Sequence, residues 1–197
     1  MAGTLPHAVF VETGLPGPQP AAAFAAELTG CASHAADPAA AVADLPAQVA
    51  EFVAWLRRRG EDVPDLVGNW YEVERAPGAG RRASFSLDEL PPSPAEGGRW
   101  MVWLELARED LAAALDAAPG AAASLRWVAG QDRSLARELG ADDAEDAPGD
   151  AVDDLYAARD LLVDAIEVAG PGAPGTRRAL RLAIANDRQA TAMIAAA

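Results

Sequence analysis

Few side chains in this sequence have the chemistry needed for catalysis or metal binding. The chain carries one cysteine, Cys31, and two histidines, His7 and His34. A Cys/His dyad at positions 31 and 34 would need a third group to orient the imidazole, and the neighbouring sequence offers none. Since nothing nearby lowers the thiol pKa, we expect Cys31 to be a small core residue. No glycine-rich phosphate loop, serine elbow or paired-carboxylate signature occurs in the sequence, so no catalytic residue is predicted.

Two carboxylates, Asp132 and Asp187, fall on the apolar stripes of two expected helices. A buried charge is costly unless it is paired, so each is expected to face an arginine, for instance Arg159 or Arg188. We favour a structural ion pair over a catalytic role. A carboxylate-only site for a hard cation remains the alternative, although Ca²⁺ prefers roughly six or more oxygen ligands.

Composition limits the possible partners. The 197 residues are 51% apolar and allow one large domain or two small ones. The formal charge is −14, from 30 acidic and 16 basic residues, and every basic residue is Arg. Such a surface repels phosphate backbones, and the two basic clusters, 57–60 and Arg81-Arg82, are interpreted as solvated ends. No nucleic-acid partner is expected.

Cysteine content and hydropathy bear on the compartment. A single cysteine excludes an internal disulfide and any multi-cysteine zinc site, as is usual in a reducing compartment. No apolar run approaches the roughly 20 residues that cross a bilayer. The first residues lack the basic and apolar regions of a signal peptide. We therefore predict a cytoplasmic protein with no membrane partner.

The first part of the chain has the patterns of a small α+β module. Strands are predicted at 7–14, 21–28, 31–37 and 69–75 from apolar and β-branched runs bounded by Gly and Pro. A helix should begin at Asp37-Pro38 and end at Gly60, because an Asp side chain caps free amides and Pro is tolerated in the first turn. Its apolar stripe consists of Val42, Leu45, Val49, Phe52 and Leu56. Pro46 is expected to kink or restart this helix.

The second part has the patterns of a helix bundle. Residues 76–98 are rich in Pro and Gly without periodicity, and they mark a domain boundary. The expected division is a module over 1–76, a linker over 77–96 and a bundle over 97–197. Amphipathic helices are predicted at 97–117, 121–139, 151–168 and 175–195. Trp100 and Trp103 belong to the first apolar stripe, where core packing is favoured over an exposed partner-binding patch. We predict an α+β protein with a β-β-β-α-β module followed by an up-down four-helix bundle.

The module resembles the HicB-like fold. The stretch ELTGCASHAADPAAAVADLPAQVAEFVAWLRRRGEDVP (27–64) has that family's strand end, Asp-Pro helix start and Trp-Leu-x-x-x-Gly exit. Thr29 stands where the family usually has Pro. In HicB antitoxins this module binds a toxin, and a separate ribbon-helix-helix or helix-turn-helix segment binds DNA. Such a segment is not found in this sequence, so the resemblance implies the module without the antitoxin role.

The segment 93–197 resembles the DinB-like bundles, a family that includes metal- and thiol-dependent transferases and hydrolases. That family holds its metal with one His on the second helix and a His-x-x-x-His pair on the fourth. In LRWVAGQDRSLARELG, Trp127 stands at the first of these positions, and in RRALRLAIANDRQATAMI, Asn186 and Ala190 stand at the pair. Trp and Ala supply no donor and an Asn amide is a poor one. The resemblance therefore implies a lost metal site, and no metal or other cofactor is expected.

These positions define a candidate pocket at Trp127, Asn186, Ala190 and Asp132. On a helical wheel, Asn186 and Ala190 lie beside the apolar stripe, next to other alanines. Asn186 could anchor a ligand, but a solvent-wetted helix flank is the favoured interpretation. Trp127 could form a wall of the pocket, but packing is favoured.

The function that these observations favour is non-catalytic binding. The protein would hold a small apolar or amphipathic ligand in the bundle, or serve as a scaffold for a protein partner or a homodimer. Two alternatives remain: a thiol-dependent transferase that uses an atypical metal or none, and an antitoxin-type regulator.

Overall fold

The computed structural model describes residues 6–78, 82–118, 120–121, 125–142, 150–170 and 172–196. The chain is an α+β protein with one four-stranded sheet and divides into two compact units, residues 1–87 and 88–197. The division falls inside the segment that the sequence marks as a linker. Each unit is described by itself.

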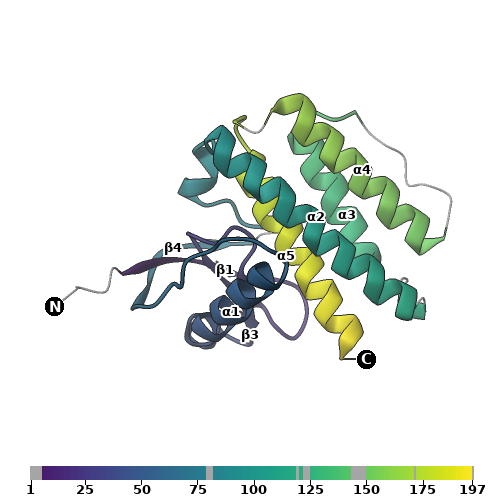
Figure 1. Ribbon diagram of the computed structural model, residues 1–197. Helices are drawn as coiled ribbons and strands as arrows, with labels where there is room; N and C mark the ends of the chain where they lie inside the picture. Colours follow the sequence, from purple (N-terminus) through teal and green to yellow (C-terminus); the bar gives the residue numbers. More distant parts are fainter. Residues whose placement is uncertain are drawn as a thin grey trace. The chain divides into compact units, whose positions relative to one another are not determined.

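The first unit contains a mixed sheet with the strand order β3-β2-β1-β4. Its strands are β1 (His7–Thr13), β2 (Ala21–Ala25), β3 (Ala32–Ala35) and β4 (Trp70–Pro77). β1 and β2, and β2 and β3, pair antiparallel, whereas β4 follows a helical crossover and pairs parallel to β1. The predicted order of elements in the module is confirmed (Figure 1).

Helix α1 (Pro38–Arg58) covers one face of this sheet. The Asp37 carboxylate accepts a hydrogen bond from the Ala40 amide at 2.9 Å, which confirms the predicted cap. Gly60, with φ +89°, follows the helix where a left-handed residue is needed. Pro46 lies inside a continuous helix, so the predicted restart is wrong. By length and hydropathy alone, α1 could cross a membrane, but its apolar side chains are those of a core helix packed on a sheet.

The other face of the sheet carries a buried carboxylate, Glu12. Its side chain accepts hydrogen bonds from the Arg82 Nε at 2.9 Å and from the Ala83 amide at 2.5 Å. Phe85, two residues on, stacks on Phe10 with ring centroids 5.0 Å apart. Arg82 is therefore a buried partner of Glu12, and the interpretation of this arginine as a solvated end is wrong. The carboxylate is the reason, because it must be neutralised where it is buried.

The second unit is built from four helices: α2 (Pro94–Ala117), α3 (Arg126–Glu138), α4 (Ala151–Ala169) and α5 (Thr176–Ala195). A short 3₁₀ helix, η1 (Ser86–Glu89), precedes them. α2 begins at Pro94, three residues before the predicted start, and Ser93 caps it, with Glu96 completing a capping box. The strongest packing joins α3 to α4 and α2 to α5, with α5 also against α3.

The directions of these helices differ from a simple up-down bundle. Arg178 at the start of α5 pairs with Glu138 at the end of α3, so those two helices run antiparallel. Leu155, early in α4, shares a core cluster with Val128, early in α3, so α3 and α4 run in the same direction. α2 and α5 also run in one direction (Figure 1). The up-down prediction is therefore wrong at the step from α3 to α4.

Candidate functional site

The centre of the helical unit is an ion cluster in which one arginine serves two carboxylates. Arg159 of α4 contacts Asp132 of α3, with Nε 2.9 Å from Oδ2. The same guanidinium pairs with Asp187 of α5. Both carboxylates are 0% exposed. The predicted ion pair is confirmed for Arg159. The other predicted partner, Arg188, pairs with Asp110 of α2, with Nη1 3.7 Å from Oδ2.

Burial and charge oppose each other in this cluster. Burial raises the pKa of Asp132, and the neighbouring Arg159, Arg108 and Arg133 oppose that rise. Burial likewise lowers the pKa of Arg159 to about 10, against the attraction of Asp132. Arg159 therefore stays charged near neutral pH, and a fixed cation holds three helices together through two acids. This arrangement is structural, because its charged groups are occupied by one another.

A second buried pair joins the same helices. Arg133 of α3 pairs with Asp154 of α4, and both side chains are about as buried as those of the cluster. With this pair in place, the buried acids Asp132, Asp187 and Asp154 are matched by Arg159, Arg133 and the partly buried Arg108. The buried charges shared by α3, α4 and α5 are thus balanced, next to an apolar core cluster.

The four residues of the candidate pocket have separate environments. Asp132 belongs to the ion cluster, and Asn186 is fully buried on α5. The favoured interpretation of Asn186 as a solvent-wetted flank is wrong, because α5 packs against both α2 and α3 and buries its flank as well as its stripe. Ala190 lies in a core cluster with leucines of α2 and α4 and with Val128 of α3, and Trp127 packs against that cluster. Apolar side chains therefore fill the space around Ala190.

Residues described by the structure include no group of three or more His, Cys, Asp or Glu side chains able to hold a metal ion. The two acids nearest to such a set, Asp132 and Asp187, are bridged by Arg159. A guanidinium thus occupies the place in which a carboxylate-only site would hold its cation.

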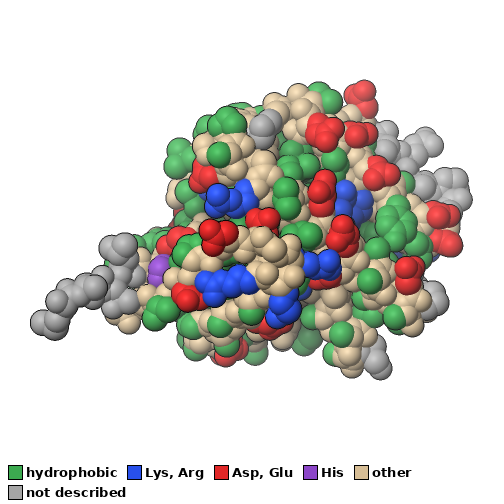
Figure 2. All heavy atoms as spheres, viewed as in Figure 1, with side chains coloured by type: hydrophobic (Ala, Val, Ile, Leu, Met, Phe, Trp, Pro, Cys, Tyr) green, Lys and Arg blue, Asp and Glu red, His purple; other side chains and the backbone are tan. Residues whose placement is uncertain are grey.

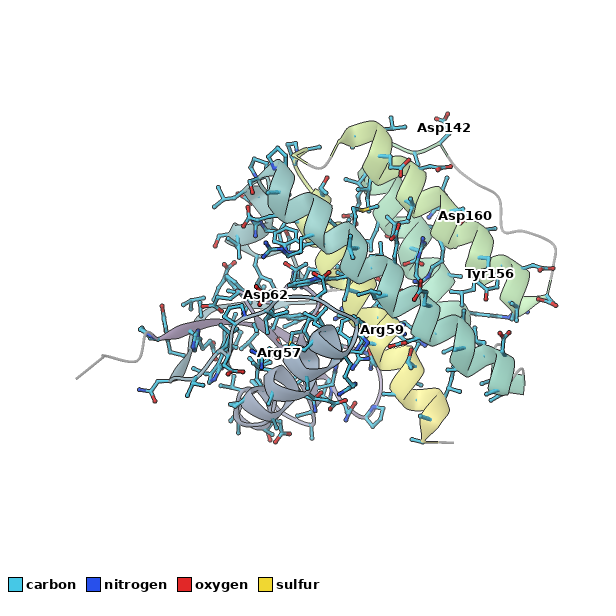
Figure 3. The ribbon with its side chains drawn as sticks, viewed as in Figure 1. Arg57, Arg59, Asp62, Asp142, Tyr156 and Asp160 are labelled. Carbon is cyan, nitrogen blue, oxygen red and sulfur yellow. The ribbon has the colours of Figure 1, made fainter. Side chains whose placement is uncertain are left out.

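An open groove lies beside the ion cluster, between α2 and α4, with a volume of about 70 Å³. Four apolar side chains and four polar ones line it: Leu111, Ala112, Leu115 and Leu155, with Arg108, Tyr156, Arg159 and Asp160. Tyr156 and Asp160 lie one turn apart on α4 (Figure 3). Arg159 is shared with the ion cluster, so the groove opens directly onto it.

Arg108 lines the groove from α2. Its Nε and Nη2 atoms are buried and have no hydrogen-bond acceptor among the described residues. Burial lowers the pKa of Arg108, while Asp132, Asp160 and Glu105 attract the charge and oppose that change. A guanidinium with two buried donors that lack acceptors is costly.

The sequence reasoning missed Arg108, Tyr156 and Asp160. One signal could have found Arg108: it lies between Leu104 and Leu111 at helical spacing, so a charge borders the apolar stripe of α2. Tyr156 and Asp160 carry no comparable signal, because both read as ordinary exposed positions of an acidic helix.

The residues of the first unit that could do chemistry are separate from this site. Cys31 is buried, as predicted for a core residue. Burial, and secondarily the charge of Arg82, lowers the pKa of His34 to about 4, so this imidazole is neutral near pH 7. His7 lies 3.4 Å from Glu27, measured from Nδ1 to Oε1.

No family model, curated protein or solved structure matches this chain. The chemistry of the site therefore rests on the geometry of the residues themselves.

Proposed function

We propose that this protein is a non-catalytic binding protein whose helical unit takes a small amphipathic molecule in the groove between α2 and α4. The observation that carries the proposal is the groove itself, in which four apolar side chains and the polar side chains of Arg108, Tyr156 and Asp160 line one small volume. Apolar walls with a few fixed polar groups are the usual composition of small-molecule sites. Binding of this kind involves no reaction.

The proposal includes the architecture that the resemblances imply. The helical unit would be a DinB-like bundle in which the cluster of Arg159, Asp132 and Asp187 replaces the metal centre. The sheet unit would be a HicB-like module that provides a binding surface or stabilises the protein. The ligand would then bind beside the former metal position, at the groove, and not at Asn186 and Ala190. Cytoplasmic location and a scaffold role toward a protein partner or homodimer remain predictions from the sequence.

The size of the groove limits the ligand. The volume is about 70 Å³. An apolar cavity of about 150 Å³ holds benzene. The buried part of the ligand is therefore a group of about three or four carbons, by the same scale.

A methyl-detected NMR titration with isobutanol tests the proposal. Isobutanol should shift the methyl signals of Leu111, Leu115 and Leu155 in a saturable way, while those of Leu45 and Leu56 in the sheet unit stay in place. In the variant Ala112→Leu, which fills the groove, the shifts should vanish. Ala113→Leu, the exposed neighbour on the same helix, is the matched control and should bind as the wild type does. Equal shifts in both variants, or none in the wild type, would contradict the proposal.

A further inference from the structure

The outer strand of the sheet, β4, has an open backbone edge. It pairs with β1 on one side, and the shorter β3 forms the opposite edge of the sheet. At the two ends of β4, the Asn69 carbonyl and the Gly78 amide hydrogen-bond to β1. Successive backbone groups of a strand point alternately to its two edges. The residues whose backbone groups point away from β1 are Trp70, Glu72, Arg75 and Pro77. Their backbone groups have no hydrogen-bond partner within the part of the chain that the structure describes.

A β-bulge at Val73 breaks the regular alternation of this strand. Glu72 lies opposite Val9, and the next pair along the ladder joins Phe10 to Glu74. The four outward residues are therefore opposite every second residue of β1, and their side chains share one side of the sheet, the side of α1. The hydrogen bonds from Arg75 to Glu72, at 2.8 and 2.6 Å, agree with this placement. Because α1 packs mainly on β2 and β3, Glu72 and Arg75 stay exposed.

The bulge decides which strands fit this edge. Charges, bulges and proline on an edge strand generally prevent pairing with other strands. A regular antiparallel strand would match the outward groups before the bulge or those after it, because Glu72 and Arg75 are three residues apart and not two. A second copy of β4, related by a two-fold axis that passes between Val73 and Glu74, has the same interval at the same place. The edge therefore fits its own copy better than a regular strand.

The charges match in the same arrangement. Glu72 of each copy lies opposite Arg75 of the other, on the same side of the sheet, and Trp70 lies opposite Pro77. Every outward residue thus faces an outward residue, and the only backbone donor missing is the N–H that proline lacks. The two acid-base pairs are equivalent across the axis, as an isologous interface requires. Opposite charges directly across from each other stabilise antiparallel strands, and like charges destabilise them.

We propose that this protein forms a homodimer by antiparallel pairing of β4 with β4 of a second copy, with Glu72 of each chain opposite Arg75 of the other. The two sheets become one continuous sheet, and Tyr71 and Val73, 46% and 45% exposed in the single chain, lie next to the interface. Acidic side chains are scattered over the face of the molecule in Figure 2, and the chain has a formal charge of −14, so the alternating charges at the axis offset a general repulsion. This inference goes beyond the proposed function and needs no ligand in the groove.

Exchange of the charges tests the dimer and its register together. Sedimentation equilibrium of the full chain between about 10 µM and about 1 mM should show a reversible dimer, because an interface between two strand edges is small and weak. Glu72→Arg places an arginine opposite Arg75, and Arg75→Glu places a glutamate opposite Glu72. Each variant alone should dimerise at least about tenfold more weakly than the wild type, since two attractive pairs become two repulsive ones.

A mixture of the two variants restores the proposed pairs. In a dimer of one Glu72→Arg chain and one Arg75→Glu chain, acid again faces base on both sides of the axis, so an equimolar mixture should regain about the wild-type affinity. The double variant Glu72→Arg, Arg75→Glu should also dimerise as the wild type does. Asp44→Arg and Arg58→Glu, exposed on α1, make the same changes in net charge away from β4 and are the matched controls.

Hydrogen exchange of the wild type gives a second readout that needs no variant. The amides of Glu72 and Arg75 should exchange more slowly as the protein concentration rises, whereas the amide of Tyr71, which points toward β1, should not change. A wild type that stays monomeric at about 1 mM would overturn the inference. So would a dimer that persists in both single variants, a mixture that stays monomeric, or an equal loss in the controls. The groove is tested separately by the isobutanol titration.

Discussion

Replacing Arg159 with Met should be the most damaging single change in the helical unit, by an amount that depends on pH. The side chain pairs with two carboxylates that are 0% exposed, Asp132 and Asp187. Methionine fills much of the same space without charge, so Arg159→Met leaves both acids buried without their shared cation. Each acid must then stay charged in the interior or take up a proton.

The cost of protonation sets the magnitude. An Asp with an ordinary pKa of about 4 takes up a proton near pH 7 at a cost of roughly 4 kcal/mol, at about 1.4 kcal/mol per pH unit. Asp132 keeps Arg108 and Arg133 nearby, so its share of the loss is the smaller one. The expected loss is therefore about 4 kcal/mol if one acid is stranded and about 8 kcal/mol if both are. Losses of this size are a large part of a typical stability of about 5–15 kcal/mol.

Acid should rescue the variant in part. Lowering the pH by about two units makes each protonation cheaper by about 2.7 kcal/mol, so the difference between variant and wild type should shrink by that amount for each stranded acid. Guanidinium denaturation followed by circular dichroism near pH 7 and near pH 5 measures the difference. The titration of His34 in the sheet unit is common to both proteins and cancels.

A matched pair of variants protects this test against a protein that does not fold. Arg126→Met removes an exposed arginine from α3 and should change the free energy of unfolding by less than about 0.5 kcal/mol. The triple variant Arg159→Met, Asp132→Leu, Asp187→Leu removes all three charges and should recover most of the lost stability, because apolar replacement of a complete buried ion cluster is often neutral or stabilising. A pH-independent loss, or a triple variant as unstable as Arg159→Met, would refute the reasoning.

Three further predictions follow from the same structure. His34→Gln should make the free energy of unfolding less dependent on pH in acid. The pKa of His34 is about 4 in the folded protein against an ordinary value of 6.5, so the wild type loses up to about 3 kcal/mol as the pH falls from 6.5 to 4. Denaturation at a series of pH values measures this dependence, and a variant that is as sensitive to acid as the wild type would contradict the prediction. Arg82→Met should lower the free energy of unfolding of the sheet unit by about 3–5 kcal/mol, because it leaves the buried carboxylate of Glu12 without its cation. The double variant Glu12→Gln, Arg82→Met should lose less stability than Arg82→Met alone. Equal losses of the two variants in thermal denaturation would contradict the pairing. Protein purified without a polyhistidine tag should contain far less than one transition-metal ion per chain by elemental analysis, and a stoichiometric metal would remove the non-catalytic proposal in favour of an atypical metal enzyme.

The local elements of the fold could be predicted because each has a signal within a few residues of sequence. Asp37 and Pro38 mark the start of α1, and Gly60 its end, so both bounds were expected from capping chemistry alone. The stripe of α2 likewise predicted its buried side, including Trp100 and Trp103. The predicted restart at Pro46 was wrong, because α1, which packs on the sheet, continues past the one backbone hydrogen bond that proline removes.

Features that depend on packing between distant segments could not be predicted. The common direction of α3 and α4 could not be predicted, because helical periodicity identifies the buried face of each helix and not its direction relative to a neighbour. Asn186 looked exposed because the wheel shows one apolar stripe, whereas α5 packs against two helices and is buried on more than one side. Arg82 looked solvated because its partner Glu12 is 70 residues away in sequence.

The candidate site was predicted in part. Asp132 and its pairing with Arg159 followed from the rule that a buried charge needs a partner. The groove could not be predicted, because it lies between α2 and α4 and the sequence does not show which residues of the two helices face each other. A charged residue at the edge of an apolar stripe, as at Arg108, is the one signal that sequence reasoning could have used.

The central claim, that the groove between α2 and α4 binds a small amphipathic molecule, is tested most directly by intermolecular nuclear Overhauser effects with isobutanol. The ligand methyl groups should show contacts to the methyl groups of Leu111, Leu115 and Leu155 and to the ring of Tyr156. These contacts should disappear in Ala112→Leu and remain in Ala113→Leu. Contacts only to residues outside the groove, or no contacts at a concentration that saturates any observed shift, would contradict the account.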